Sequence, residues 1–139
     1  MNKRKVDNLI RAAYEVLKEV KVPDEKNIGQ YIYIVNSNKV DNKWRGYISS
    51  FGAAISTGSL LSAIAFFSAK NSAALHRELL IMAIEKLLNK ENLFQYIADN
   101  INDERRIKEE IIEAAVALKL AMNFYDLGKG EVENNGNQP

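Results

Sequence analysis

Two residue types that build common reactive sites are almost missing from this chain. It has no cysteine in 139 residues, which excludes disulfide bonds and thiolate metal sites and is typical of a protein from a reducing cytoplasm. His76 is the single histidine, so no metal site with two or more imidazoles can form. No apolar segment follows the basic start Met1–Lys5, so that start does not have the form of a secretory signal. We therefore expect a cytoplasmic protein without a metal site.

Catalytic motifs are missing as well. Gly52 and Gly58 do not form a phosphate loop, because no Gly-x-x-x-x-Gly-Lys-Ser/Thr pattern surrounds them. Glu109 and Glu113 are four residues apart, and without a Glu-x-x-His pattern we interpret them as part of a solvated helix face. The expected protein is not an enzyme and has no catalytic residues, no cofactor and no small-molecule substrate.

Acidic residues are absent from one long tract, residues 42–77. This tract contains Lys43, Arg45, Lys70 and Arg77, although the net charge of the whole chain is only +1. Such a distribution is typical of an electrostatic partner surface. It is equally compatible with helices that carry solvated charges wherever they face water.

Hydrophobic periodicity predicts helices along most of the chain. Apolar residues make up 47% and charged residues 27%, an ordinary globular composition. The prediction is an all-α, single-domain bundle of about five helices over residues 1–127, followed by a disordered tail over 128–139. We predict helices over residues 4–21 and 39–70, from Asn71 or Ser72 to Leu88, after Asn92, and from Asn102 or Asp103 to Gly128. An interruption of the second helix near Gly58 stays open, and residues 24–38 form an irregular connection in which a helical turn is the alternative.

The final predicted helix carries an apolar stripe at heptad-like spacing. Such a stripe serves either an intramolecular core or a partner helix, and the spacing alone does not distinguish them. The stripe consists of Ile107, Ile111, Ala114, Leu118, Ala121 and Tyr125.

Residues 46–69 contain no charge, and their length could span a bilayer. Six serines and a threonine lower their hydropathy, and the flanking amphipathic helices need an apolar partner in water. We therefore predict a long, uncharged central helix in the core, with a small membrane protein as a rival hypothesis.

Aromatic residues alternate with the basic ones in the acid-free tract. Basic side chains bind phosphates, and aromatic rings can stack on bases. Helical spacing favours a core position for Trp44, Tyr47, Phe66 and Phe67. For Arg45, Lys70 and Arg77 both interpretations stay open.

Several residues between Trp44 and Leu88 follow one another at recognisable spacings. An aromatic residue, an isoleucine, a leucine, an Ala-Phe pair and a lysine four residues after the phenylalanine occur in order: Trp44, Ile55, Leu60, Ala65–Phe66 and Lys70. Glu113, Leu118 and Phe124 add a second set near the C-terminus. This pattern resembles the small all-helical subunit of Cmr-type (type III-B) CRISPR RAMP effector complexes.

The chain also departs from that family's pattern, so it resembles a diverged member. Most of the changed positions lie in the central segment, and the others lie in the last helix. Gly52 replaces a usual proline, Gly58–Ser59 replaces Asn-Gly, Ser49–Ser50 stand where lysines are common, Leu120 replaces a tryptophan, and Met122–Asn123 replace a basic pair.

The resemblance implies a non-catalytic subunit in antiviral defence. Several copies would stack beside the guide RNA, contact the other effector subunits and line the path of the target RNA. Arg45, Lys70 and Arg77 would then contact RNA phosphates without reading sequence, and Lys70 matches the family lysine. The alternative is a helical protein–protein adaptor that makes no contact with nucleic acid.

Overall fold

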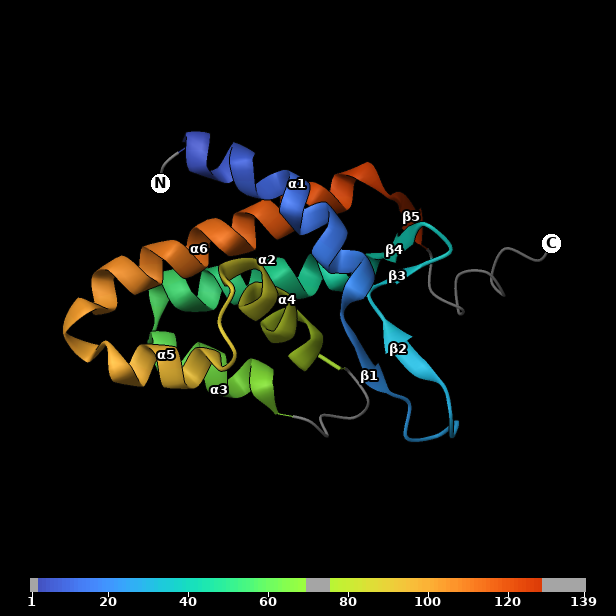
Figure 1. Cartoon of the computed structure of the whole chain (residues 1–139), viewed down its shortest axis with the longest axis horizontal. Helices are drawn as coiled ribbons and strands as arrows, with labels where there is room; N and C mark the ends of the chain where they lie inside the picture. Colours follow the sequence, from blue (N-terminus) through green and yellow to red (C-terminus); the bar gives the residue numbers. More distant parts are fainter. Residues whose placement is uncertain (1–2, 70–75, 129–139) are drawn as a thin grey trace.

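A computed structural model describes residues 3–69 and 76–128, which form a helical bundle with two small β-sheets at one end (Figure 1). The all-α prediction is confirmed for the bulk of these residues. The α-helices are α1 (Lys3–Glu19), α2 (Asn42–Thr57), α3 (Leu60–Ser68), α4 (Glu78–Leu88), α5 (Leu93–Asp99) and α6 (Glu104–Ala121). The 3-10 helices are η1 (Ile101–Asp103) and η2 (Met122–Phe124), and the strands are β1 (Lys21–Pro23), β2 (Tyr31–Tyr33), β3 (Val35–Asn36), β4 (Lys39–Asp41) and β5 (Asp126–Gly128).

Helix α6 lies at the centre of the bundle and packs against α1, α2 and α4. Its predicted apolar stripe, from Ile107 to Tyr125, is buried at every position. The buried residues Ala114, Ala115, Ala117 and Ala121 have small side chains. Three neighbouring helices can therefore pack close to the backbone of α6. The stripe therefore forms an intramolecular core, a question that the spacing alone left open.

A single long central helix is not what forms: the uncharged segment divides into α2 and α3 near Gly58, the interruption that the sequence left open. The backbone turns at Gly58, where an added Cβ would lie 3.0 Å from the Ala54 carbonyl oxygen. Ser59 then caps α3, and its side chain accepts a hydrogen bond from the Ser62 backbone N–H at 3.3 Å. No helix within residues 3–69 and 76–128 is long and apolar enough to cross a membrane.

The irregular connection predicted for residues 24–38 is also wrong, because most of it belongs to two antiparallel hairpins. Strand β2 pairs with β1, with Val22 opposite Ile32. The second hairpin joins β3 to β4 through Ser37 and Asn38, which both have positive φ, as a tight two-residue hairpin turn requires. Strand β5 adds to β4 in parallel and brings Gly128 beside Asp41.

Of three further predicted helix boundaries, two change and one is confirmed. The final helix ends at Ala121, before η2 and β5, so Gly128 does not terminate it. Asp103 is the N-cap residue of α6, as predicted, although its side chain makes no capping hydrogen bond. Helix α4 begins only at Glu78, after His76 adopts a left-handed conformation with φ of 57°, while the predicted caps Asn71 and Ser72 lie outside the described residues.

Tyr125 fixes the C-terminal end of the bundle to α1. Its ring stacks on Tyr14 with centroids 4.4 Å apart and an interplanar angle of 8°. Its hydroxyl donates a 2.7 Å hydrogen bond to the Tyr14 carbonyl oxygen. Burial of the hydroxyl is the main cause that raises the pKa of Tyr125 well above its ordinary value of 10.0, and Tyr14 and Glu15 raise it further. The neutral phenol is therefore the form that stabilises the fold.

Replacing Tyr125 by phenylalanine should lower the free energy of unfolding by about 1 kcal/mol, the usual contribution of one hydrogen bond. Because the folded pKa is raised, the native contribution of Tyr125 is complete below about pH 10 and is lost as the pH rises further. Urea unfolding at pH 8 to 11 should therefore show a shallower alkaline loss of stability in Tyr125→Phe than in the parent protein. Tyr31→Phe, on the exposed β2 strand, is the control. Equal alkaline slopes in the parent and Tyr125→Phe would contradict this role.

Candidate nucleic-acid interface

The first turn of α2 sets the position of the basic and aromatic residues. Asp41, at the end of β4, caps α2 by accepting a 3.0 Å hydrogen bond from the Lys43 backbone N–H. The next residue, Trp44, is buried, and its ring contacts Tyr47 edge to face at 5.4 Å. Lys43 lies exposed, with its Nζ 5.0 Å from the Trp44 ring centroid. Lys43 and Tyr47 therefore lie next to each other at the surface above a buried tryptophan.

The core positions predicted for the aromatic residues are half right. Trp44 and Phe67 are buried, as helical spacing indicated, whereas Tyr47 is half-buried and Phe66 is 59% exposed. The α3 helix turns Phe67 into the core, where it meets Phe51 at 5.1 Å, and this orientation turns the adjacent Phe66 outward. Phe66 is thus an aromatic ring that the fold leaves at the surface.

Arg77 lies against Phe66, and its charge is near enough to act on Tyr47. Its guanidinium carbon lies 4.3 Å from the Phe66 ring centroid, a cation–π contact, and 5.9 Å from that of Phe67. Burial is the main cause that raises the pKa of Tyr47, and the nearby Arg77 charge opposes this shift. The four residues Lys43, Tyr47, Phe66 and Arg77 form what we term the cation–aromatic surface.

Arg45 hydrogen-bonds to residues of η2. Its guanidinium donates a 2.9 Å hydrogen bond to the Met122 carbonyl oxygen and a 3.0 Å bond to Asn123 Oδ1. These bonds tie α2 to η2, at the end of α6, and the arginine is half-buried there. The hydrogen bonds of Arg45 are therefore made to η2, and no contact with the cation–aromatic surface is seen among the described residues. Lys70, the third predicted contact residue, lies outside the described residues.

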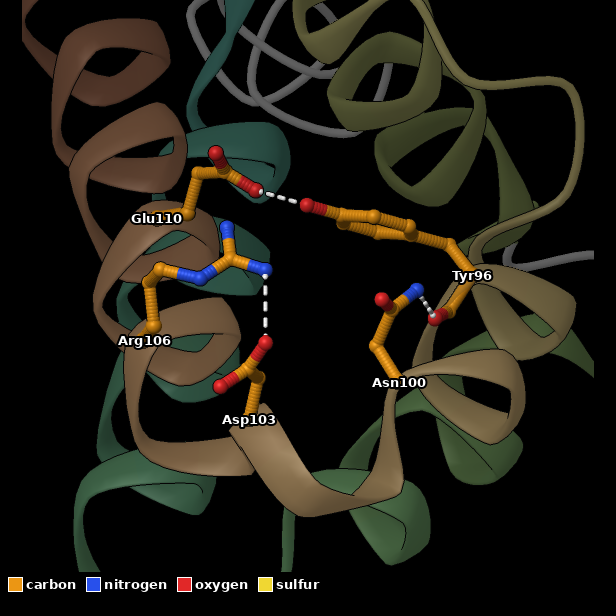
Figure 2. Close-up of polar contacts among 5 residues, drawn as sticks. All are labelled: Tyr96, Asn100, Asp103, Arg106 and Glu110. Carbon is orange, nitrogen blue, oxygen red and sulfur yellow. Dashed lines mark hydrogen bonds and ion pairs between the residues drawn. The ribbon is translucent and has the colours of Figure 1, made fainter.

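A second polar cluster lies between α5 and α6 (Figure 2). The Tyr96 hydroxyl donates a 2.6 Å hydrogen bond to Glu110 Oε1, and this bond is the main cause that raises the pKa of Tyr96. Asn100 donates from its side chain to the Tyr96 carbonyl oxygen at 2.8 Å, and Arg106 pairs with Asp103 at 3.4 Å. Each contact fastens the short α5 and the turn after it, so we interpret the cluster as structural.

The solvated face predicted for Glu109 and Glu113 is wrong for Glu113. Its side chain is only 4% exposed and lies 3.3 Å from the Lys5 Nζ across the α1–α6 contact. A carboxylate buried at this depth requires such a partner, because an isolated charge would be costly to remove from water. Within residues 3–69 and 76–128, no three histidine, aspartate or glutamate side chains gather as metal ligands would.

A family model described as CRISPR-associated protein (Cas_Cmr5) matches residues 7–123. The chain belongs to the Cmr5 family. The match runs from the first half of α1 to η2 and therefore includes the whole cation–aromatic surface. Comparisons with curated proteins and with solved structures give no match.

Family membership confirms the resemblance that the residue spacings indicated. It indicates a CRISPR-associated subunit of the Cmr type and an association with a Cmr complex. Trp44 and Ile55, two of the residues that carry the resemblance, are buried in α2, and Leu60 is buried in α3. These matching positions therefore belong to the core of the bundle, while Phe66 belongs to its surface.

Replacing Arg45 by alanine in this Cmr5-family protein should lower the free energy of unfolding by about 1.5–3 kcal/mol, because two hydrogen bonds from a charged group are lost. Lys43→Ala, two residues earlier and exposed, should change it by less than about 0.5 kcal/mol. Urea unfolding of both variants tests the difference. A stable Arg45→Ala protein would show that the link between α2 and η2 is unimportant for folding.

Proposed function

We propose that the chain is a non-catalytic small subunit of a type III-B CRISPR RNA-guided effector complex, and that its cation–aromatic surface contacts phosphates of the target RNA. The observation that carries the proposal is the contact of Arg77 with exposed Phe66, next to Tyr47 and Lys43, within a tract that has no acidic residue from 42 to 77. In this function several copies stand in a row beside the guide RNA and support antiviral defence from the cytoplasm.

The chemistry of this surface suits a single strand. Lys43 and Arg77 supply positive charge that neutralises phosphates and releases counterions. Phe66 offers a ring face on which a base of any identity can stack. Neither type of contact selects a sequence, which fits a subunit whose target is chosen by pairing with a guide.

Among the three residues predicted from the sequence, Arg77 and Lys70 remain the proposed phosphate contacts. Arg45 has its hydrogen-bonding capacity partly used by η2, so we assign its main role to the fold. Lys43 takes its place, because it is exposed on the first turn of α2 beside Tyr47. Lys70 keeps its place on the sequence evidence, as the last basic residue before Arg77 in the acid-free tract.

The Lys43→Gln/Arg77→Gln double variant, which removes both positive charges of the cation–aromatic surface, should bind target RNA more weakly once assembled into the effector complex. If two phosphate contacts are lost per copy, the slope of log affinity against log salt should fall by about 1.4 per copy, since each contact to a single strand contributes about 0.7. Filter binding or fluorescence anisotropy over a salt series measures this slope.

The matched control is Lys108→Gln/Lys119→Gln, which removes two positive charges from α6. It should leave the salt slope close to that of the parent complex. If both double variants changed the slope equally, the effect would come from net charge, and the assignment to the cation–aromatic surface would be wrong.

The half-burial of Arg45 and Arg77 favours one second candidate, the adaptor that contacts only proteins. Affinity purification of the tagged chain from its native cells separates the two functions. We expect other effector subunits together with a guide RNA of uniform length. A single protein partner recovered without RNA would instead support the adaptor.

A further inference from the structure

The β1–β2 hairpin ends in an ordered tip with an apolar residue at the surface. Ile28 in this tip is 98% exposed. Hydrogen bonds hold the backbone around it: the Asp24 N–H donates to the Gln30 carbonyl oxygen at 2.9 Å, and the Asp24 carboxylate accepts from the Lys26 N–H at 3.0 Å. Gly29 completes the turn with φ of 87°. The fold thus presents an isoleucine on a preorganised support, although its exposure to water is unfavourable.

An apolar hollow lies between α1 and η2. It is shallow and open to solvent, has a volume of about 550 Å³ and is lined by Asp7, Ile10, Arg11, Tyr14 and Phe124. The four α1 residues occupy one face of the helix, because they are spaced by three, four and seven positions. Phe124 forms the other wall and is 67% exposed. Since Tyr14 is stacked on Tyr125, part of the lining is held rigidly by the core.

We propose that the Ile28 tip of one copy inserts into the α1–η2 hollow of the next copy. This inference rests on the proposed function, in which copies stand in a row, and it names the contact that joins them. The tip and the hollow are different surfaces of the chain, and the hairpin extends from the C-terminal end of α1 (Figure 1). A contact between two different surfaces is heterologous, so it can repeat along a row and does not stop at a symmetric pair.

Charge complementarity supports a second copy as the occupant. The tip carries Glu25 next to Lys26, and the hollow carries Arg11 and Asp7 one helical turn apart. Placing Glu25 beside Arg11 and Lys26 beside Asp7 pairs opposite charges around the buried Ile28, an arrangement of apolar centre and polar rim that is common in protein interfaces. A nucleic-acid occupant is less favoured, because Asp7 would face its phosphates.

Cysteine cross-linking can test the contact cleanly, because the chain has no cysteine of its own. The full-length double variant Gln30→Cys/Asn8→Cys keeps Ile28, Phe124 and the paired charges Glu25 and Arg11, and it places one exposed thiol beside each proposed surface. A short bismaleimide reagent, applied without RNA, should convert it into a ladder of dimers, trimers and longer chains. The same reaction is run in the assembled effector complex, where neighbouring copies are held together.

The control Gln30→Cys/Arg105→Cys moves the second thiol to the opposite end of α6 from the hollow. The ladder of the test variant should form at least about tenfold faster than that of the control, because docking raises the effective concentration of the paired thiols. Adding Ile28→Asp to the test variant should reduce its rate to that of the control, whereas Ile28→Val should leave it unchanged. Ile28 is exposed, so neither change should affect folding, and circular dichroism verifies this.

Equal rates in the test and control variants, in the isolated chain and in the complex alike, would overturn the proposal. A fast ladder that Ile28→Asp does not slow would also overturn it. If no ladder forms and Phe124→Asp weakens RNA binding instead, the hollow is a nucleic-acid site and the contact between copies is wrong. Since the ladder is measured without RNA, its failure is distinguishable from a failure of the salt-slope experiment on the cation–aromatic surface.

Discussion

The packing of α6 against three other helices is the constraint on which the rest of the structure depends. Helix α6 contacts α1, α2 and α4 at once, which requires small side chains on its buried faces. The buried alanines of α6 meet this requirement. The partner helices then supply the bulk, with Leu17, Phe51 and Ile84 fully buried around it. The close packing leaves little room for larger side chains on α6, because protein interiors are already near crystal density.

Several polar side chains of this protein fasten one helix to another element of the fold. Tyr125 bonds to α1, Arg45 bonds to η2, and Tyr96 joins α5 to α6. In each case the bond joins two different elements of the fold. The one buried carboxylate among the described residues, Glu113, follows the same rule through its pairing with Lys5. These bonds therefore fix the relative position of helices whose packing is otherwise non-directional.

Helix existence could be predicted from the sequence far better than helix boundaries or local pairing. The periodic stripe of α6 is strong enough to identify its buried face, and Asn92 forms its predicted cap on α5. The β1–β2 hairpin was missed because β1 has only three residues and directly follows a helix whose periodicity extends into it. Residue type alone could not distinguish the roles of Arg45 and Arg77. The role of Arg45 depends on its hydrogen bond to Met122, which is distant in sequence. The role of Arg77 depends on its contact with Phe66, which only the fold establishes. Charge identifies a candidate for binding, but only the fold shows whether its hydrogen bonds are already made.

The central position of α6 also bears on how the protein comes to fold as it is synthesised. Helix α6 is the last α-helix of the described residues, so α1, α2 and α4 leave the ribosome before the surface on which they pack exists. Until then their apolar faces have only one another to cover them, and isolated helices of this length are marginal in water. Completion of the core must therefore wait for the C-terminal part of the chain, and the protein acquires its native structure late in synthesis and largely in one step.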